Sequence, residues 1–461
     1  MRAFLVSSIG VTCAATVVLP LSLPTDTANR ASAATAATAS ESVTPEPAAP
    51  GKTSRLPGST QSLPLVPLSS PGDEVSLGLP AREVEPFALL GVVWNDPEEE
   101  VHGRIQVRTR STDTGDWSPW QELQTHSHRP DSAADEGRGG GLRGGTSPLW
   151  VGGSDGVQVR VLPEKGDGPG TGAGLPEGLR VDLVDPGDAP SGAPADDLSA
   201  LDLASSRANA RLAPVGAHEI PALDREATQD DLLAVHGDGQ KPERDAGEDT
   251  GPAGALAARA RAPIGPRPGI VTRRGWGADE RLRGPFLYTK TVKTAFIHHT
   301  AMSNGYSCGQ APSLIRGIYR YHVQSNGWRD VGYNFFVDKC GKIYEGRAGG
   351  VARPVMGAHT FGFNDNSTGI AVLGSYDSAK PSAAALDAVT GLVAWKLGLH
   401  GINPAGTVTV TSGGGKYAKG AKVRLRAVSG HRDGSATGCP GDRLYRELGN
   451  IRARAARLQG R

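Results

Sequence analysis

Two stretches of biased composition restrict where this chain of 461 residues can form a hydrophobic core. Residues 34–83 are rich in Ala, Ser, Thr and Pro, and residues 188–265 are rich in Ala, Asp, Gly and Pro. Segments of this kind bury too little apolar surface to offset the entropy that folding costs. We therefore interpret both as disordered spacers and expect the folded domains in the two regions that remain, 84–187 and 266–461.

Residues 1–33 have the pattern of a secretory signal peptide. Arg2 is followed by an apolar run without charges, and the small residues "ASA" at 31–33 fit a cleavage site. An uncleaved N-terminal anchor is the alternative. No other apolar stretch approaches membrane-spanning length. We therefore expect a secreted protein, extracellular or associated with a cell wall, whose mature chain has no stable membrane span.

The region 84–187 predicts a small module of β-strands. Segments such as "FALLGVVW", "GRIQVRTR" and "GVQVRVL" alternate in part between apolar and polar residues, and Gly, Pro and Asp separate them. No long helical period intervenes, so we expect an all-β, sandwich-like module. Its tryptophans either stack on sugar rings or belong to the core, and we favour the core. They are Trp94, Trp117, Trp120 and Trp150.

The region 266–461 reads as a mixed α/β domain. Strand patterns occur in "TVKTAFIHHT", "VGYNFFVD", "KIYEGR" and "GIAVLGSY". Helical spacing occurs in "APSLIRGIYRYHVQ" and "GDRLYRELGNIRARAARL", and "PSAAALDAVTGLVAWKLGLHG" begins with Pro and ends at Gly, as helices prefer. We expect a central mixed β-sheet flanked by helices.

The charges are divided unequally along the chain. Residues 266–461 contain 28 Lys and Arg against 11 Asp and Glu, a balance of +17, which leaves 21 against 37, or −16, for residues 1–265. A basic C-terminal half is compatible with a polyanionic partner, which would be an anionic wall polymer or a nucleic acid. The alternative is a charged surface that is only solvated. Charge alone does not decide between these.

Three cysteines remain once the N-terminal segment is set aside, and an odd number in an exported protein requires an explanation. Two can form a disulfide, so the third needs another role. A histidine of "IHHT", together with His431 and Cys439 of "SGHRDGSATGCPG", supplies three nitrogen and sulfur ligands for Zn²⁺, with the fourth position left for water. The alternatives are histidines that only pack or are solvated, and a buried free thiol at Cys439.

Five blocks of the C-terminal region occur in the order of a known family. The region from about 266 to 447 resembles the family of peptidoglycan recognition proteins and N-acetylmuramoyl-L-alanine amidases, which are zinc amidases. The blocks are "IHHTA", "GWRDVGYNFFVD", "IYEGRAGG", "GAHTFGFNDNSTGIAVLG" and "SGHRDGSATGCPG".

The resemblance implies a role for particular residues. The zinc ligands of the family match His298, His431 and Cys439, and a catalytic tyrosine matches Tyr333. The residue two before the ligand cysteine is Lys or Thr in active members, and here it is Thr437. Non-catalytic receptors of the family commonly replace the ligand cysteine, so its presence favours an enzyme.

Five further polar residues have weaker functional interpretations. His299 lines the cleft or packs beneath it, and His322 lies on the apolar side of its helix, which favours a structural role. For His359, a position at the border of the substrate groove and a position away from that groove are equally compatible with the sequence. Arg347 and Asn364 contact substrate or are only solvated.

We therefore expect a secreted, zinc-dependent N-acetylmuramoyl-L-alanine amidase domain over 266–461 that hydrolyses the lactyl–L-alanine amide bond of peptidoglycan. The alternatives are a non-hydrolytic peptidoglycan receptor and a structural wall protein. The expected partners are peptidoglycan and an anionic wall polymer, without nucleic acid, and no oligomeric state is predicted. The resemblance and the exported context also imply a disulfide between Cys308 and Cys340. By analogy with secreted actinobacterial relatives, the 84–187 module has a wall-targeting role.

Overall fold

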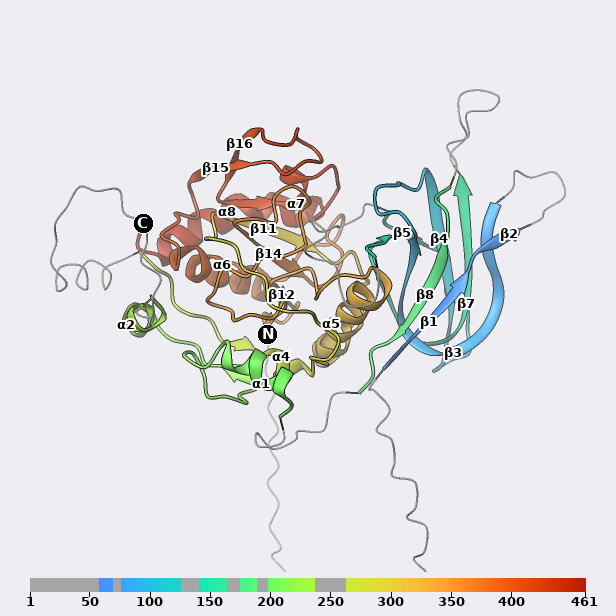
Figure 1. The fold of residues 1–461 in the computed structure, drawn as a ribbon, viewed down its shortest axis with the longest axis horizontal. Coiled ribbons are helices and arrows are strands. Elements are labelled where there is room, and N and C mark those ends of the chain that lie inside the picture. The colour runs from blue at the N-terminus through green and yellow to red at the C-terminus, as the bar shows by residue number, and fades with distance from the viewer. Residues whose placement is uncertain (1–57, 69–75, 126–140, 164–174, 189–197, 237–262) are drawn as a thin grey trace, which may run out of the picture. The chain divides into compact units, whose positions relative to one another are not determined.

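The structure is a computed structural model, and it contains two sheets and a separate hairpin (Figure 1). It describes residues 58–68, 76–125, 141–163, 175–188, 198–236 and 263–461. The predicted signal peptide, residues 1–33, lies outside these ranges. Within them, no helix combines the length and the apolar character needed to cross a bilayer.

The N-terminal module is an antiparallel sheet of eight strands (blue to green in Figure 1). Its main path has the order β1-β8-β3-β7-β4-β5, and β2 and β6 pair with β3. The predicted all-β module is thereby confirmed. The strands are β1 (Ser59–Pro64), β2 (Val66–Leu68), β3 (Ser76–Trp94), β4 (Gly103–Ser111), β5 (Gln121–Leu123), β6 (Gly144–Gly145), β7 (Leu149–Pro163) and β8 (Arg180–Asp185).

The module begins earlier than the sequence interpretation places it. Strands β1 and β2 and the first part of β3 lie within 34–83, which the composition assigns to a disordered spacer. Strand β1 pairs with β8 over its whole length, from Ser59 opposite Asp185 to Pro64 opposite Arg180. The backbone hydrogen bonds to a neighbouring strand hold this edge strand, so it needs few apolar side chains of its own.

The C-terminal domain contains a mixed sheet of seven strands in the order β17-β11-β14-β12-β13-β10-β9. The pairs β11–β14, β11–β17, β12–β14 and β10–β13 are parallel, whereas β12–β13 and β9–β10 are antiparallel. This confirms the predicted central mixed sheet. The strands are β9 (Glu219–Ile220), β10 (Ile270–Val271), β11 (Thr294–His299), β12 (Phe335–Val337), β13 (Ile343–Glu345), β14 (Ser367–Val372) and β17 (Val428–Gly430).

Helices flank this sheet, and strands β15 (Thr407–Thr411) and β16 (Lys422–Arg426) form a separate hairpin. The α-helices are α1 (Ala200–Arg207), α2 (Arg225–His236), α4 (Arg273–Trp276), α5 (Ala311–Arg320), α6 (Ala383–Gly398), α7 (His431–Gly434) and α8 (Asp442–Leu458). A short 3-10 helix, η3 (Cys308–Gln310), precedes α5, and a π-helical turn, η4 (Tyr321–Ser325), follows it.

The alternation of side chains along each strand distributes them between two cores. In β12, Phe335 and Val337 pack in the cluster that contains the apolar residues of α6 and α8, whereas Phe336 packs in the cluster that contains α5. Successive side chains of a strand point to opposite faces of a sheet, so helices cover both faces. All six residues of β11 are buried, which explains its uninterrupted "TAFIHH".

The stretch 188–265, interpreted as a disordered linker, also contributes to the domain. It contains α1, β9 and α2, and β9 pairs with β10. Its few large apolar side chains, among them Leu212, Ile220 and Leu232, are buried in the same cluster as α6 and α8. A segment that docks on an existing core needs only a few such anchors, which composition averaged over 78 residues does not reveal.

A disulfide joins Cys308 and Cys340, as the resemblance implied. The two residues are 32 positions apart and enclose α5 and β12. In the chain-entropy account, closing a loop of this length constrains the unfolded chain by about 3–4 kcal/mol.

Candidate metal centre and active site

The order of the strands brings two histidines together. His298 lies near the end of β11, and His431 directly follows β17. These strands are parallel neighbours, with Ile297 opposite Gly430, so the two histidines leave the sheet at the same edge and in register. Their rings lie 4.5 Å apart, centroid to centroid, and both residues are buried.

The chain after α7 folds back and inserts Cys439 beside them. The backbone N–H of Arg432 donates to the carbonyl oxygen of Cys439 at 2.9 Å, which closes the loop. The backbone N–H of His299 donates to Cys439 Sγ at 3.4 Å, and this sulfur lies 3.8 Å from His298 Nδ1. The thiol is buried and belongs to no disulfide.

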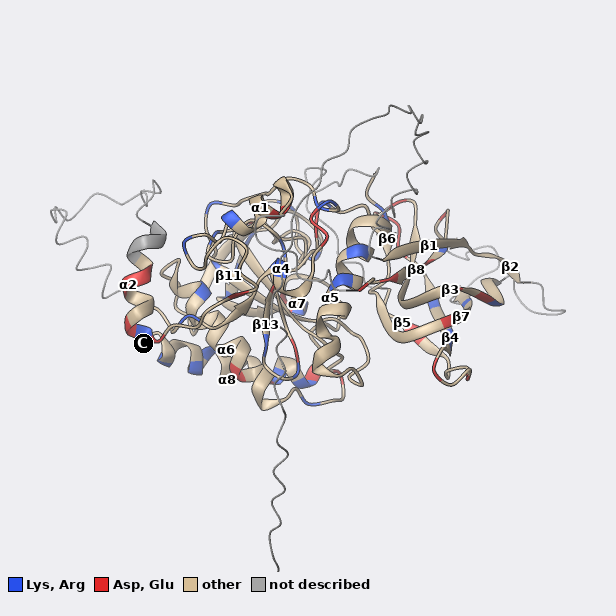
Figure 2. Ribbon diagram, turned by 90° about the horizontal axis from the view of Figure 1, so that it is seen from below, with Lys and Arg blue, Asp and Glu red and all other residues tan. Residues whose placement is uncertain are grey.

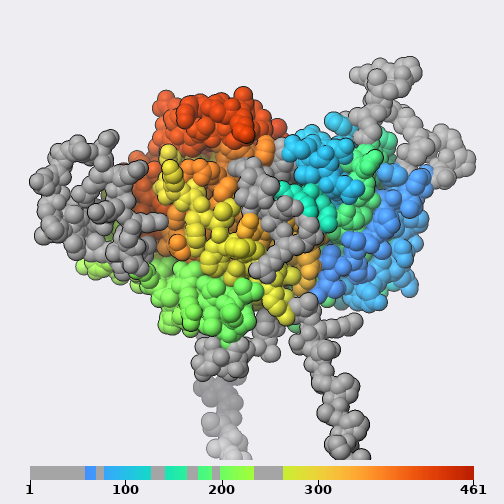
Figure 3. Space-filling view, in the orientation of Figure 1, coloured from blue at the N-terminus to red at the C-terminus, as the bar shows by residue number. Residues whose placement is uncertain are grey.

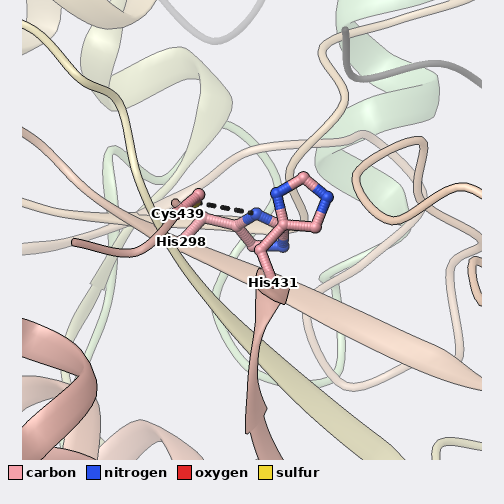
Figure 4. A group of neighbouring side chains, drawn as sticks. All are labelled: His298, His431 and Cys439. Atoms are coloured by element: carbon pink, nitrogen blue, oxygen red, sulfur yellow. Dashed lines mark hydrogen bonds between the residues drawn. The ribbon is translucent and has the colours of Figure 1, made fainter. Parts of the chain in front are cut away.

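The three side chains form a compact donor set (Figure 4). One ligand atom from each lies within 4.8 Å of the other two. Tetrahedral zinc with ordinary Zn–N and Zn–S bonds needs separations of about 3.3–3.8 Å between its ligand atoms. Side-chain adjustments of about an ångström bring this set to that geometry. In the part of the chain that the structure describes, no other group of His, Cys, Asp and Glu satisfies the same criterion.

Burial controls the protonation of the thiol. It raises the pKa of Cys439 to about 12, so the thiol keeps its proton when no cation is present. Only the deprotonated thiolate binds a metal strongly, so metal uptake at this site must displace that proton.

His299 takes no part in this donor set. Its ring is buried, and burial lowers the pKa of His299 to about 4, so the side chain is neutral. Its Nδ1 accepts a hydrogen bond from the backbone N–H of Tyr376 at 3.3 Å. Of the two roles considered for His299, the structure favours packing beneath the site.

His359 lies behind His298 and not at the border of a groove. Its Nδ1 is 3.2 Å from His298 Nε2, and the residue is fully buried. The backbone N–H of His359 donates to Asn364 Oδ1 at 2.7 Å, which fixes the loop that carries it. A Cβ atom at Gly369 would lie 2.4 Å from His359 Cγ, so the glycine in β14 provides the space for this ring.

Tyr333 also neighbours His298. The centroids of the two rings are 5.2 Å apart, and Tyr333 is 5% exposed. Burial raises the pKa of Tyr333 well above its ordinary value, so the phenol keeps its proton and remains a hydrogen-bond donor. Thr437 is half-buried, and its Oγ1 accepts from the backbone N–H of Cys439 at 3.2 Å.

The remaining polar residues belong to the framework. Arg347 is buried and donates to the carbonyl oxygens of Val331 and Met356, at 2.8 and 3.2 Å. Asn364 is fully buried, so neither it nor Arg347 is solvated. His322 accepts from the backbone N–H of Gly332 at 3.1 Å, which agrees with a structural role.

The tryptophans of the N-terminal module divide into two pairs. Trp94 is buried in the apolar cluster of the module, which agrees with the favoured interpretation. Trp150 is also buried, but in another cluster, whereas Trp117 and Trp120 are only half-buried. The guanidinium of Arg108 lies 5.2 and 5.1 Å from the ring centroids of Trp117 and Trp120, and that of Arg160 lies 4.2 Å from Trp120. Two arginines thus contact the Trp120 ring, and these cation–π contacts explain the half-buried pair without a sugar.

Comparison with known proteins places the chain in a family. The profile described as N-acetylmuramoyl-L-alanine amidase matches residues 288–442, and the profile described as Rv3811 N-terminal galactose-binding domain-like matches 37–187. Peptidoglycan-recognition protein 1 of Holotrichia diomphalia is 30% identical over 183 residues, which are 40% of this chain and 80% of that protein. The chain belongs to the peptidoglycan recognition protein family.

Two further proteins are also similar to part of the chain. Human N-acetylmuramoyl-L-alanine amidase is 31% identical over 180 residues, which are 39% of this chain and 27% of the human protein. The solved structure of wild-type Drosophila PGRP-LB is 30% identical, covers 39% of this chain and 91% of its own, and has a TM-score of 0.32.

Proposed function

We propose that this protein is a zinc-dependent N-acetylmuramoyl-L-alanine amidase that hydrolyses the amide bond between the lactyl group of N-acetylmuramic acid and L-alanine in peptidoglycan. One observation carries the proposal. The donor atoms of His298, His431 and Cys439 converge within 4.8 Å. The family membership supports a protein that cleaves or binds peptidoglycan, and the converged donors favour cleavage.

The residues present fit a catalytic zinc. His298, His431 and Cys439 would hold the ion, and a zinc bound by three protein ligands would supply an activated water and polarise the scissile carbonyl. Tyr333 keeps its phenolic proton and donates a hydrogen bond to the carbonyl oxygen as negative charge develops there. Thr437 holds the loop of Cys439 through the backbone N–H of that residue, so its first role is to position this ligand.

The remaining parts of the chain have roles that accompany this activity. We propose that residues 1–33 direct export and that the N-terminal β-module attaches the enzyme to the wall. The export proposal is supported by the charge and apolar pattern of the first residues. The attachment proposal is supported by the separate sheet of the module.

Digestion of purified peptidoglycan tests the proposed function. The full chain with zinc should release stem peptides with a free L-alanine amino group and leave muramic acid with a free lactyl carboxylate, both detected by mass spectrometry. Chelation should stop this release, and restored zinc should return it. Binding to peptidoglycan without peptide release would show a receptor. Cleavage at a different bond would show another hydrolase.

Replacement of His359 tests how the metal ligand is oriented. If Nδ1 of His298, the nitrogen nearest to the Cys439 sulfur, were the metal ligand, the remaining ring proton would lie on Nε2, which is 3.2 Å from Nδ1 of His359 and could donate to it. Loss of such a partner typically weakens metal binding about 10–100-fold, and we expect this for His359→Ala. The measurement is zinc affinity against a competing chelator, with melting temperatures of both metal-free proteins as the folding control. Zinc affinity equal to that of the parent would contradict the orienting role.

A further inference from the structure

The hairpin formed by β15 and β16 presents a row of cations on one face. Lys422, Arg424 and Arg426 are exposed, and they alternate with the buried Val423 and Leu425. Opposite them in the register stand three threonines of β15. The pairs are Thr411 with Lys422, Thr409 with Arg424 and Thr407 with Arg426. We name this face, with its three cations and three threonines, the cationic ribbon.

The ribbon is fixed close to the candidate metal centre. Val423 and Leu425 pack with Phe296 of β11, which lies two residues before His298. The hydroxyl of Tyr417, in the turn of the hairpin, donates to the carbonyl oxygen of Asp433 at 3.2 Å. The apolar face therefore packs against the domain, and the cationic side chains are exposed on the opposite face. The hairpin itself lies at the outer edge of the domain (orange-red, labelled β15 and β16 in Figure 1), and the orange-red segment is at the surface in Figure 3.

No acidic residue of the hairpin balances this charge. The sequence contains neither Asp nor Glu between Asp387 and Asp433, although five exposed cations lie in that interval. They are Lys416, Lys419, Lys422, Arg424 and Arg426. Among the described residues, none of the three ribbon cations forms an ion pair. Lys422 donates instead to Thr411 Oγ1 at 2.6 Å, and Arg424 contacts Thr407 Oγ1 at 3.3 Å.

The first half of helix α8 shows what an ordinary charged surface of this domain looks like. Arg443 and Arg446 lie between Asp442 and Glu447 in the sequence, and acidic and basic residues occur together on this helix in Figure 2. Arg454 pairs with Asp387 of α6 at 2.5 Å. A surface that serves only solubility mixes both signs in this way, whereas the ribbon carries a single sign.

The side chains of the ribbon match a chain of phosphates. Arg, Lys and Thr are among the side chains with which proteins hold the phosphates of a linear polymer, and guanidinium groups bind phosphate oxygens in pairs. Strand geometry places successive cations about 6.7 Å apart, so one extended polymer meets the whole row. The six residues of the face include no aromatic side chain on which a nucleic-acid base would stack.

We infer that the cationic ribbon binds a linear polymer with repeating phosphate groups that is attached to peptidoglycan, and that it thereby brings the metal centre to wall that carries this polymer. The inference rests on the proposed function, because peptidoglycan is the material that carries the polymer to the site. The inference names a substrate class for the candidate metal centre, namely peptidoglycan that carries a phosphate polymer.

The experiment compares two variants of the full chain that lose the same charge. In the ribbon variant, Lys422, Arg424 and Arg426 all become Thr, which suits an exposed strand. In the control variant, the exposed Arg443, Arg446 and Arg457 of α8 all become Gln, which suits a helix. Binding is measured by co-sedimentation over a range of salt concentrations. The probes are wall that carries poly(glycerol phosphate) and the same wall after that polymer is removed.

The ribbon variant should bind the polymer-bearing wall roughly 10–100-fold more weakly than the parent at low salt. The slope of log affinity against log salt should fall by about 2–3, because three phosphate contacts are lost. The α8 control should bind within about twofold of the parent. Polyphosphate should compete with the polymer-bearing wall for binding to the parent protein. Once the polymer is removed from the wall, the parent and the ribbon variant should bind that wall with the same affinity.

Four outcomes would overturn the inference. Equal loss in both variants would show general charge attraction. Unchanged binding after polymer removal, or better competition by polyglutamate than by polyphosphate, would exclude phosphate as the ligand. Better competition by a DNA oligonucleotide would make the ribbon a nucleic-acid surface. Sedimentation requires no hydrolysis, so an inactive metal centre would contradict the proposed function and leave this measurement intact.

Discussion

The Cys439→Ala variant is expected to bind almost no zinc and to release no peptide from peptidoglycan. Cys439 is the thiol of the converged donor set, and its removal leaves two histidines for the metal. Thiolate contributes strongly to zinc affinity, so the loss should exceed the roughly 10–100-fold that removal of a hydrogen-bond partner of a ligand costs. Two quantities are measured: the zinc content after dialysis, and the release of peptide from peptidoglycan.

Melting curves separate metal loss from unfolding in this variant. Zinc bound to the folded state should raise the melting temperature of the parent and leave that of Cys439→Ala unchanged. Without zinc, the two proteins should melt within a few degrees of each other, because the substitution leaves only a small buried cavity. Full zinc content in Cys439→Ala would remove Cys439 from the ligand set.

The Tyr333→Phe variant is expected to keep its zinc and to lose turnover. The substitution retains the ring that lies 5.2 Å from His298 and removes only the hydroxyl. Loss of one donor to a developing oxyanion typically lowers turnover about 10²–10³-fold, and peptidoglycan binding should remain close to that of the parent. Turnover, zinc content and binding are all measured on the same preparation.

Tyr319→Phe is the matched control for this substitution. Tyr319 is also a buried tyrosine, but its hydroxyl donates to the carbonyl oxygen of Asp279 at 3.0 Å, and its ring packs against Trp276. Its loss should lower stability by about 1 kcal/mol and leave turnover unchanged. Parental turnover in Tyr333→Phe would refute the catalytic role, and equal loss in both variants would show that the effect comes from the fold.

Local patterns predict the elements of the C-terminal domain but not its limits. The buried strand "TAFIHH" and the helix α8 are recognisable in the sequence because one is an apolar run and the other has a long apolar period. Composition does not identify strand β1 or the anchors Ile220 and Leu232, because neighbouring segments hold them. Interactions of that kind leave little trace in the composition of the segment itself.

The candidate functional residues divide in the same way. The family blocks of the sequence are enough to select His298, His431, Cys439, Tyr333 and Thr437. They do not reveal that His359 stands behind His298, because a histidine in a Gly-rich loop is as compatible with a groove as with a core. Gly369, which faces the His359 ring, is the one sequence signal for this buried position. It can be interpreted only once the structure shows that β14 passes beside His359.

The amino-acid sequence specifies the chemistry of this protein: which nitrogen and sulfur donors exist, which residues alternate along a strand, and where charge of one sign accumulates. Which of these groups meet depends on the tertiary fold. Cys439 lies 140 residues after His299, yet its sulfur accepts from the backbone N–H of His299 because β11 and β17 are parallel neighbours. Side-chain identity is local, whereas the distance between two donors is fixed by strand order, register and the packing of both faces of the sheet.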